Sequence, residues 1–406
     1  MKQLITKLVI LMVSVLGSIN TYAYDFEVNG ICYDVIDPAS LTCGVSGLID
    51  KEITGNVVIP AHISFAGKEL TVTEILESAF AESLIENISL PSTCILVGRS
   101  AFWRCSKLLA INIPQGVTKI GRHAFGFCSG LKEISLPKSI IEIGEYAFSD
   151  CENLDSVNIC DLEAWCAISF EAGWCYNLND TYTSNPLSNM KAKLLLNGEL
   201  ISSLHFDESI SKINPGAFVG YTYLTEVDLT NNIQSIGRYS FWNCANLYKL
   251  SIGQGLSEIP NQAFTKCISL SELYIADGDQ ELKFNGGIRG DRYNPIATDF
   301  IAGDFRDSKL KIVYIGRQLV QPKTTNAIKG YYAIFDQQDI DSVTIGPKVN
   351  LITKSYFNGS FISGSGLLGG VKNILKLTIL PSNNPLFCMF EDIDYGVVSG
   401  SPFRLI

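Results

Sequence analysis

Hydrophobic and polar positions repeat along this chain with a period of 23 residues. Two clear units begin at Thr118 and Ile141, and each carries an Ile-Gly pair, an Ala-Phe pair, a cysteine and a leucine before an alternating apolar run. The same spacing separates the phenylalanines of two arrays, which are Phe102, Phe125 and Phe148, then Phe218, Phe241 and Phe264. A fixed period of this length predicts a repeat architecture rather than separate globular domains.

Each unit predicts a short strand with two kinds of side chain. The alternation after Leu131 directs Ile134 and Leu136 inward, and it directs Glu133 and Ser135 outward. A unit of 23 residues cannot bury its own apolar side, so neighbouring coils must stack on it, with their strands paired in parallel about 4.8 Å apart. The Ile-Gly pair predicts a second short strand followed by a bend, where glycine tolerates unusual dihedral angles. The phenylalanine is expected to fill the middle of each coil.

The repeat resembles the BspA-like class of leucine-rich-repeat surface proteins of anaerobic bacteria, whose unit reads I-G-x-x-A-F-x-x-C-x-x-L-x-x-I-x-L-P. The resemblance is close over residues 70–160 and 200–275 and loose over 340–385. It implies a leucine-rich-repeat solenoid, a β-rich, curved, right-handed stack of coils with short parallel strands and few short helices. It also implies a surface protein involved in adhesion to host matrix proteins or to other microbes.

The chain begins with the three regions of a secretory signal peptide. Lys2 and Lys7 precede an apolar run, and small or polar residues lead to an expected cleavage site after Ala23. A membrane anchor is the alternative, but a bilayer span needs about 20 apolar residues and this run is nearer 12. We therefore expect the mature protein to be secreted or held at the cell surface, with no transmembrane segment after signal removal.

The rest of the chain divides into three parts. Residues 24–70 alternate without the full motif and are expected to form an N-terminal β cap that shields the first coil. Residues 71–275 form the solenoid, with an irregular segment at 160–200. Residues 276–406 carry degenerate repeats with loop insertions, among them a flexible insertion at 358–370 rich in glycine and serine. The C-terminal end is either an atypical capping coil or an incomplete array.

Composition narrows the choice of function. The chain is 47% hydrophobic and 18% charged, which suits a large core and excludes intrinsic disorder. Lys and Arg number 31 against 41 Asp and Glu, for a net charge of −10. Cations supply most of the affinity for a phosphate backbone, so an acidic chain without basic runs is not expected to bind nucleic acid.

The spacing of the cysteines predicts that most of them are packing residues of the core. One repeat position holds Cys105, Cys128 and Cys151 and, in the second array, Cys244 and Cys267; these are expected to be free buried thiols that point the same way. Export permits disulfides, so pairing stays open for Cys32, Cys43, Cys160, Cys166 and Cys175.

No catalytic, metal or cofactor site is expected. The sequence has no Cys-x-x-Cys pair and only three histidines, widely spaced, so a zinc or redox site is not indicated. His123 reads as a solvated turn residue rather than a catalytic base, and Asp277-Gly278-Asp279 reads as a solvated turn rather than a calcium site.

The outward positions of successive strands form the candidate binding surface. Solenoids use such an extended concave face for protein or glycan ligands. Its members are Asn87, Ser89, Asn112, Glu133, Ser135, Ser156, Asn158, Glu226, Asp228, Lys249, Ser251, Glu272 and Tyr274. Exposed aromatic side chains are further candidate contacts; these are Trp103, Trp242, Tyr221 and Tyr223. Trp103 and Trp242 each follow a core phenylalanine, so packing is an equal alternative for them.

These features predict an exported, non-catalytic binding protein, a cell-surface adhesin or interaction module for host matrix proteins or other cells. A glycan-binding or uptake-associated surface protein, a structural spacer and an exported enzyme are the alternatives. An enzyme requires polar residues that converge in one pocket, whereas a glycan binder requires a row of exposed aromatic side chains and a spacer requires neither.

Overall fold

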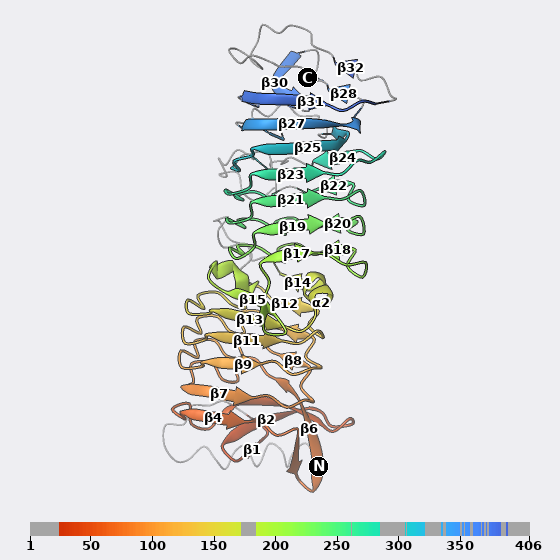
Figure 1. Ribbon diagram of the computed structural model, residues 1–406. Helices are drawn as coiled ribbons and strands as arrows, with labels where there is room; N and C mark the ends of the chain where they lie inside the picture. The colour runs from red at the N-terminus through yellow and green to blue at the C-terminus, as the bar shows by residue number, and fades with distance from the viewer. Residues whose placement is uncertain are drawn as a thin grey trace.

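The protein is a long stack of coils, with the N-terminal strands at one end and the C-terminal strands at the other (Figure 1). The computed structural model describes residues 24–171, 184–260, 262–284, 305, 307–320, 334–335, 338–349, 351–352, 354–357, 360–366, 368, 371, 373–382 and 387–388. The expected signal peptide at 1–23 lies outside these residues. The predicted leucine-rich-repeat solenoid is confirmed, because each coil adds short strands that pair in parallel with those of its neighbours.

The first half of the stack carries a seven-stranded sheet, here called the first ladder. Its order is β16-β15-β13-β11-β9-β7-β4, and β15–β16 is its antiparallel pair. Its strands are β4 (Gly55–Val58), β7 (Ile85–Ser89), β9 (Ala110–Asn112), β11 (Glu133–Leu136), β13 (Ser156–Ile159), β15 (Lys193–Leu196) and β16 (Glu199–Leu200).

A nine-stranded sheet forms a second side of the same coils. Two of its two-residue strands coincide with predicted Ile-Gly positions, since they end at Ile120 and Ile143 and the glycine follows directly. Towards the N-terminus it continues into the antiparallel pairs β1–β2, β2–β3 and β5–β6. The strands are β1 (Phe26–Val28), β2 (Ile31–Asp37), β3 (Thr42–Leu48), β5 (His62–Phe65), β6 (Lys68–Ile75), β8 (Leu96–Val97), β10 (Lys119–Ile120), β12 (Glu142–Ile143) and β14 (Ser169–Phe170).

The second half repeats this arrangement with longer coils towards its end. Its seven-stranded sheet, the second ladder, is parallel throughout. The strands are β17 (Ser203–His205), β19 (Glu226–Leu229), β21 (Lys249–Ile252), β23 (Glu272–Ile275), β25 (Ile312–Arg317), β27 (Asp339–Lys348) and β31 (Asn373–Ile379).

Smaller sheets complete the second half. Two of them, β18–β20 and β22–β24–β26, are parallel and match the two-residue strands of the first half. The segment expected as a flexible insertion instead forms a strand, β30, paired antiparallel with β29. The bounds are β18 (Lys212–Ile213), β20 (Ser235–Ile236), β22 (Glu258–Ile259), β24 (Leu282–Phe284), β26 (Leu319–Val320), β28 (Leu351–Ile352), β29 (Lys354–Phe357), β30 (Ser360–Gly366) and β32 (Phe387–Cys388).

A column of phenylalanine rings fills the centre of the stack. Phe125 is fully buried between Phe102 and Phe148, with ring centroids 5.2 and 5.4 Å away and nearly parallel planes. In the second half, Phe241 lies in the same way between Phe218 and Phe264, 5.3 Å from each. The predicted column is confirmed, and stacking in this geometry adds to the hydrophobic gain of burying each ring.

The repeated cysteine is a hydrogen-bond donor as well as a packing residue. The thiol of Cys128 donates to the carbonyl of Phe102 in the preceding coil at 2.9 Å, and that carbonyl also accepts the backbone N–H of Cys105. Cys151, Cys244 and Cys267 each donate to the equivalent phenylalanine carbonyl. A small side chain that satisfies a buried carbonyl fits this position, because leaving a buried polar group without a partner is costly.

A junction of irregular structure joins the two ladders. It contains α2 (Leu162–Ala167), which starts at the N-cap Asp161, and the short 3-10 helix η2 (Pro186–Asn189). Trp165 and Asn185 are buried there and donate to the backbone carbonyl of Ala217 at 3.1 and 3.0 Å. These bonds connect the end of the first ladder to the first coil of the second. The two halves also share one continuous hydrophobic core.

Candidate ligand-binding face

The predicted outward residues of the first ladder lie in two columns along the sheet. The strand register places Asn87, Ala110, Glu133, Ser156 and Lys193 side by side in one column. A second column, two residues further along each strand, holds Ser89, Asn112, Ser135, Asn158 and Leu195. All ten side chains are exposed or half-buried, whereas the intervening Ile134 and Val157 are fully buried.

The second ladder carries the same two columns. One holds Ser203, Glu226, Lys249, Glu272, Ile312, Ser342 and Lys376, and the other holds His205, Asp228, Ser251, Tyr274, Tyr314, Thr344 and Thr378. None of these side chains is buried. We call the four columns together the ladder face. Every strand residue predicted for the binding surface belongs to it.

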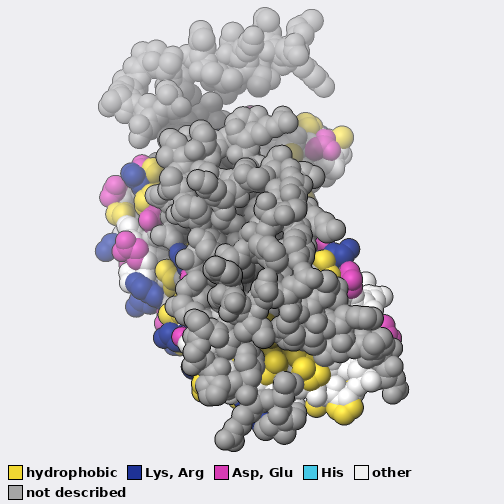
Figure 2. Space-filling view, turned by 90° about the horizontal axis from the view of Figure 1, so that it is seen from above, with side chains coloured by type: hydrophobic (Ala, Val, Ile, Leu, Met, Phe, Trp, Pro, Cys, Tyr) yellow, Lys and Arg dark blue, Asp and Glu magenta, His cyan; other side chains and the backbone are white. Residues whose placement is uncertain are grey.

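Two charged pairs lie within the ladder face, whereas Lys193 pairs with Asp155 outside its columns. Lys249 lies 3.7 Å from Glu226 on the neighbouring strand, and the His205 ring lies 2.7 Å from Asp228. Asn158 is partly engaged in the fold, because its side-chain oxygen accepts the backbone N–H of Gly198 at 2.9 Å. Figure 2 looks along the stack and shows acidic and basic side chains next to one another at its sides. Such exposed pairs contribute little stability, so their arrangement is free to serve recognition.

Two tyrosines form the aromatic part of the ladder face. Tyr274 is 45% exposed and stacks on Tyr314 with ring centroids 4.6 Å apart and planes 14° apart. The hydroxyl of Tyr314 donates to Asp277 at 2.8 Å, and burial together with this bond raises the pKa of Tyr314, so the hydroxyl stays protonated. The sequence indicated Tyr274 but not Tyr314, which lies 40 residues later, outside the 23-residue period.

The four candidate aromatic contacts lie away from the strands of the ladder face. Tyr221 was expected to be exposed, and this is wrong: it is fully buried, and its hydroxyl donates to the carbonyl of Ile201 at 2.5 Å. The reason is its position 23 residues before Cys244, at the buried cysteine position of the repeat. Tyr223 is half-buried against the core.

For the two tryptophans, the packing alternative holds. Trp242 is 9% exposed and Trp103 is half-buried. Each lies under a cation, with the Arg104 guanidinium 4.1 Å from the Trp103 ring and the Lys266 ammonium 4.6 Å from the Trp242 ring. Neither ring forms part of the ladder face.

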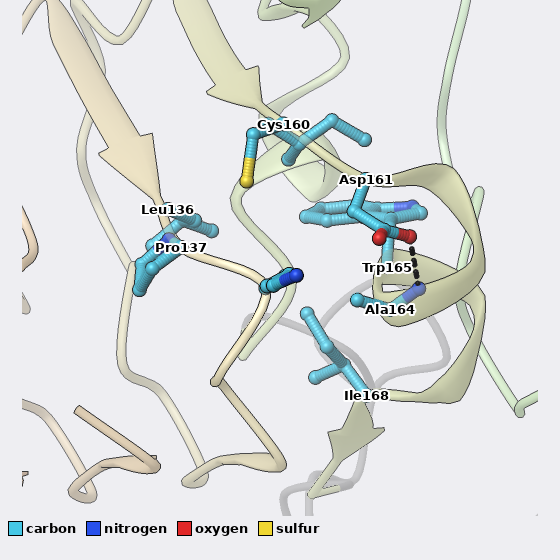
Figure 3. A pocket seen from close by; sticks show the side chains of 9 residues that line it. Leu136, Pro137, Cys160, Asp161, Ala164, Trp165 and Ile168 are labelled. Atoms are coloured by element: carbon cyan, nitrogen blue, oxygen red, sulfur yellow. Dashed lines mark hydrogen bonds between the residues drawn. The ribbon is translucent and has the colours of Figure 1, made fainter. Parts of the chain in front are cut away.

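Two recesses in the described part of the chain do not gather catalytic groups. One is a shallow recess beside α2 with about 180 Å³ of empty space, lined by Leu136, Pro137, Lys138, Ile159, Cys160, Asp161, Ala164, Trp165 and Ile168 (Figure 3). The carboxylate in this recess belongs to Asp161, and it caps α2 by accepting a hydrogen bond from the backbone N–H of Ala164 at 2.9 Å. The other recess is lined by Gln234, Ser235, Ile236, Ser257, Glu258 and Pro260.

The cysteines with described side chains form no disulfide, and Cys151 at the repeat position is not activated. Ten cysteines are free thiols, including Cys32, Cys43, Cys160 and Cys166, so the pairing that was open for these four does not form; Cys175 lies outside the described ranges. Burial raises the pKa of Cys151 to about 12, which keeps the thiol protonated.

His123 differs from its expected solvated state, because it is half-buried and its ring stacks on Tyr146 at 5.0 Å. Burial, together with nearby Arg122 and Arg99, lowers the pKa of His123. Within the described ranges, no three His, Cys, Asp or Glu side chains lie close enough to hold a metal ion. In the same residues, no helix is long and apolar enough to cross a membrane.

Comparison with known families identifies the repeat. Residues 63–179 and 190–285 match the model of the BspA type leucine rich repeat region in six copies. No curated protein matches the chain significantly.

Solved structures with a similar chain course include a leucine-rich repeat protein from Bacteroides ovatus, which is 20% identical with a TM-score of 0.44, over 88% of this chain and 78% of that one. The pneumococcal vaccine antigen PcpA is 18% identical with a TM-score of 0.40, over 94% and 93% of the two chains. A leucine rich cell surface protein from Faecalibacterium prausnitzii is 15% identical with a TM-score of 0.28, over 86% and 93%.

Proposed function

The chain belongs to the BspA-type leucine-rich-repeat family, and from that premise we propose that it is an exported, non-catalytic protein that binds another protein at the cell surface. The proposed partner is a host matrix protein or a protein on another cell. Export rests on the signal-peptide pattern of residues 1–23.

One observation carries the proposal: the ladder face is an extended, registered array of short polar side chains that the fold does not bury. Along the first ladder, the exposed Asn112 and Glu133 alternate with fully buried core residues such as Ile134. Each strand is held rigidly by its neighbours, so the side chains are presented at a fixed spacing of about 4.8 Å. A preorganised surface loses little conformational entropy on binding, which favours recognition of an extended partner surface.

The test is a binding screen with a face-directed variant. The purified protein is screened against immobilised matrix proteins, mucins, whole bacterial cells and a glycan array. The variant Asn112→Ala/Glu133→Ala/Ser135→Ala removes three neighbouring side chains of the ladder face and leaves Asn158 in place, because Asn158 supports the β15–β16 turn. We expect it to lose at least tenfold in affinity for the protein that the screen identifies.

The matched control removes an exposed pair from a different side of the coil. Arg122 and Glu145 form an ion pair at 3.4 Å, and the variant Arg122→Ala/Glu145→Ala leaves no charge unpaired. We expect it to bind as the unmodified protein does. Equal affinity of the face variant, binding to glycans alone, or turnover of a substrate without binding would each contradict the proposal.

A further inference from the structure

The ring of Tyr274 offers one open aromatic face. Tyr314 covers its other face at 4.6 Å, so the ring stands across the strands with its free face directed towards β21. Tyr314 is itself held in place by Asp277. Gly346 makes that bond possible, because a Cβ at this position would lie 2.8 Å from the Tyr314 hydroxyl oxygen.

The strand register places a position with a short side chain, here called the slot, beside this open face. Ser251 is the partner of Tyr274 on β21, and Asp228 is the partner of Ser251 on β19. The serine side chain is short, whereas the tyrosine and aspartate on either side of it are longer. Adjacent strands are about 4.8 Å apart, so the backbones at Asp228 and Tyr274, two strands apart, are separated by about 10 Å. The far side of Asp228 is occupied by the His205 ring.

The charges around the slot favour a cation. Three carboxylates, those of Glu226, Asp228 and Glu272, occupy the two columns beside Ser251. Lys249 lies among them and is paired with Glu226. The chain as a whole carries a net charge of −10, so its long-range field also attracts basic partners.

We propose that the slot over Ser251 receives an arginine side chain from a basic segment of the protein partner. A planar guanidinium above Ser251 would lie about 5 Å from the Tyr274 ring, within the range of a cation–π contact. Stacked on that ring, it would turn its other face towards Asp228 and one edge towards the column that holds Glu226 and Glu272. Arginine fits better than lysine because its flat group stacks on an aromatic face and bonds a carboxylate with two donors. The inference rests on the proposed protein-binding function and names the partner's chemistry.

The experiment measures peptide binding by fluorescence anisotropy at low salt. The probes are a labelled eight-residue peptide of alternating arginine and glycine, and matched peptides with lysine or glutamate in place of arginine. Ser251→Leu closes the slot and Tyr274→Ala removes its aromatic wall, whereas Ser251→Ala keeps the slot open. Tyr24→Ala removes a tyrosine of similar exposure outside the ladder face. Circular dichroism verifies that every variant is folded.

The proposal expects the arginine peptide to bind most tightly, with at least fivefold weaker binding to Ser251→Leu and Tyr274→Ala. Ser251→Ala and Tyr24→Ala should change the affinity less than twofold. Unchanged binding of the arginine peptide to Ser251→Leu would overturn the proposal. Displacement of the peptide by the glycan chitotetraose would also overturn it, and so would a second copy of the chain bound in the slot.

The outcome also separates this inference from the broader function. If the protein found in the screen binds Ser251→Leu normally but binds the Asn112/Glu133/Ser135 variant weakly, the binding function stands and the arginine slot does not. If no protein binds the chain at all, the proposed function itself fails.

Discussion

Removing one ring from the phenylalanine column tests how the stack is held together. Phe125 is fully buried and contacts a ring on each side, at 5.2 and 5.4 Å. Phe125→Ala loses the burial of the ring and leaves a cavity, which costs about 3–5 kcal/mol in a packed core. Phe125→Leu keeps most of the volume and loses two ring contacts of about 0.5–1.5 kcal/mol each, so its cost is about 1–3 kcal/mol.

The chain supplies a matched control two residues away. Phe127 is 41% exposed; its ring meets the edge of Trp103 at 6.2 Å and lies 5.6 Å from the Arg104 guanidinium. Because these contacts are at the surface, Phe127→Ala should cost less than about 1 kcal/mol. Urea unfolding followed by far-ultraviolet circular dichroism gives the change in the free energy of unfolding. Hydrogen exchange with mass spectrometry then locates the change along the stack.

In a quasi-one-dimensional stack, the damage should remain local. The amides of the coils around Phe102, Phe125 and Phe148 should lose protection in Phe125→Ala, whereas those around Phe264 should keep it. Equal losses of stability in Phe125→Ala and Phe127→Ala, or loss of protection first in the coil of Phe264, would refute the reasoning.

Two further predictions concern buried polar groups. The pKa of Cys151 is raised from 9.0 to about 12 by burial, so the folded state resists ionisation; the thiol's contribution to stability is complete below pH 9 and declines as the pH rises towards 12. At pH 10 the lost stabilisation amounts to about 1.4 kcal/mol. Between pH 8 and pH 10, the free energy of unfolding measured in urea should therefore fall by about 1.4 kcal/mol more in the unmodified protein than in Cys151→Ser. An identical fall in both proteins would contradict this prediction. Tyr221→Phe removes the hydroxyl that bonds Ile201 and the backbone N–H of Leu194, and should cost about 1–3 kcal/mol in unfolding free energy, whereas Tyr223→Phe, on a half-buried ring, should leave stability nearly unchanged; equal effects of the two would show that the buried bonds contribute nothing.

The sequence predicts most of the coils because stacking imposes a strict phase. Phe102, Phe125 and Phe148 must overlie one another, so the number of residues between them is fixed wherever the intervening turns are the same. The same phase orders the outward residues, which explains why Glu133 and Ser135 were placed correctly on the strand.

The later coils were predicted only as degenerate repeats with loop insertions, because their turns vary in length. The core positions Leu273, Val313, Val343 and Leu377 stand in register on successive strands of the second ladder, although they are separated by 40, 30 and 34 residues. The additional residues leave the strands unchanged, so a search at one period misses Tyr314 and with it the stacked pair on the ladder face.

Tyr221 shows a different limit. Its burial follows from its phase relative to Cys244, but a large aromatic fits a cysteine position only because the junction leaves room for it beside β15. That room depends on the irregular segment between the ladders, which no repeat rule describes.

Hydroxyl-radical footprinting of the protein bound to the partner from the binding screen tests most directly whether the ladder face is the binding surface. We expect bound partner to reduce labelling of Tyr274 and Tyr314 on the ladder face and to leave Trp103 and Phe127 labelled as in the free protein. Protection of Trp103 and Phe127 with unchanged labelling of the two tyrosines would place the binding surface on another side of the stack and contradict the proposal.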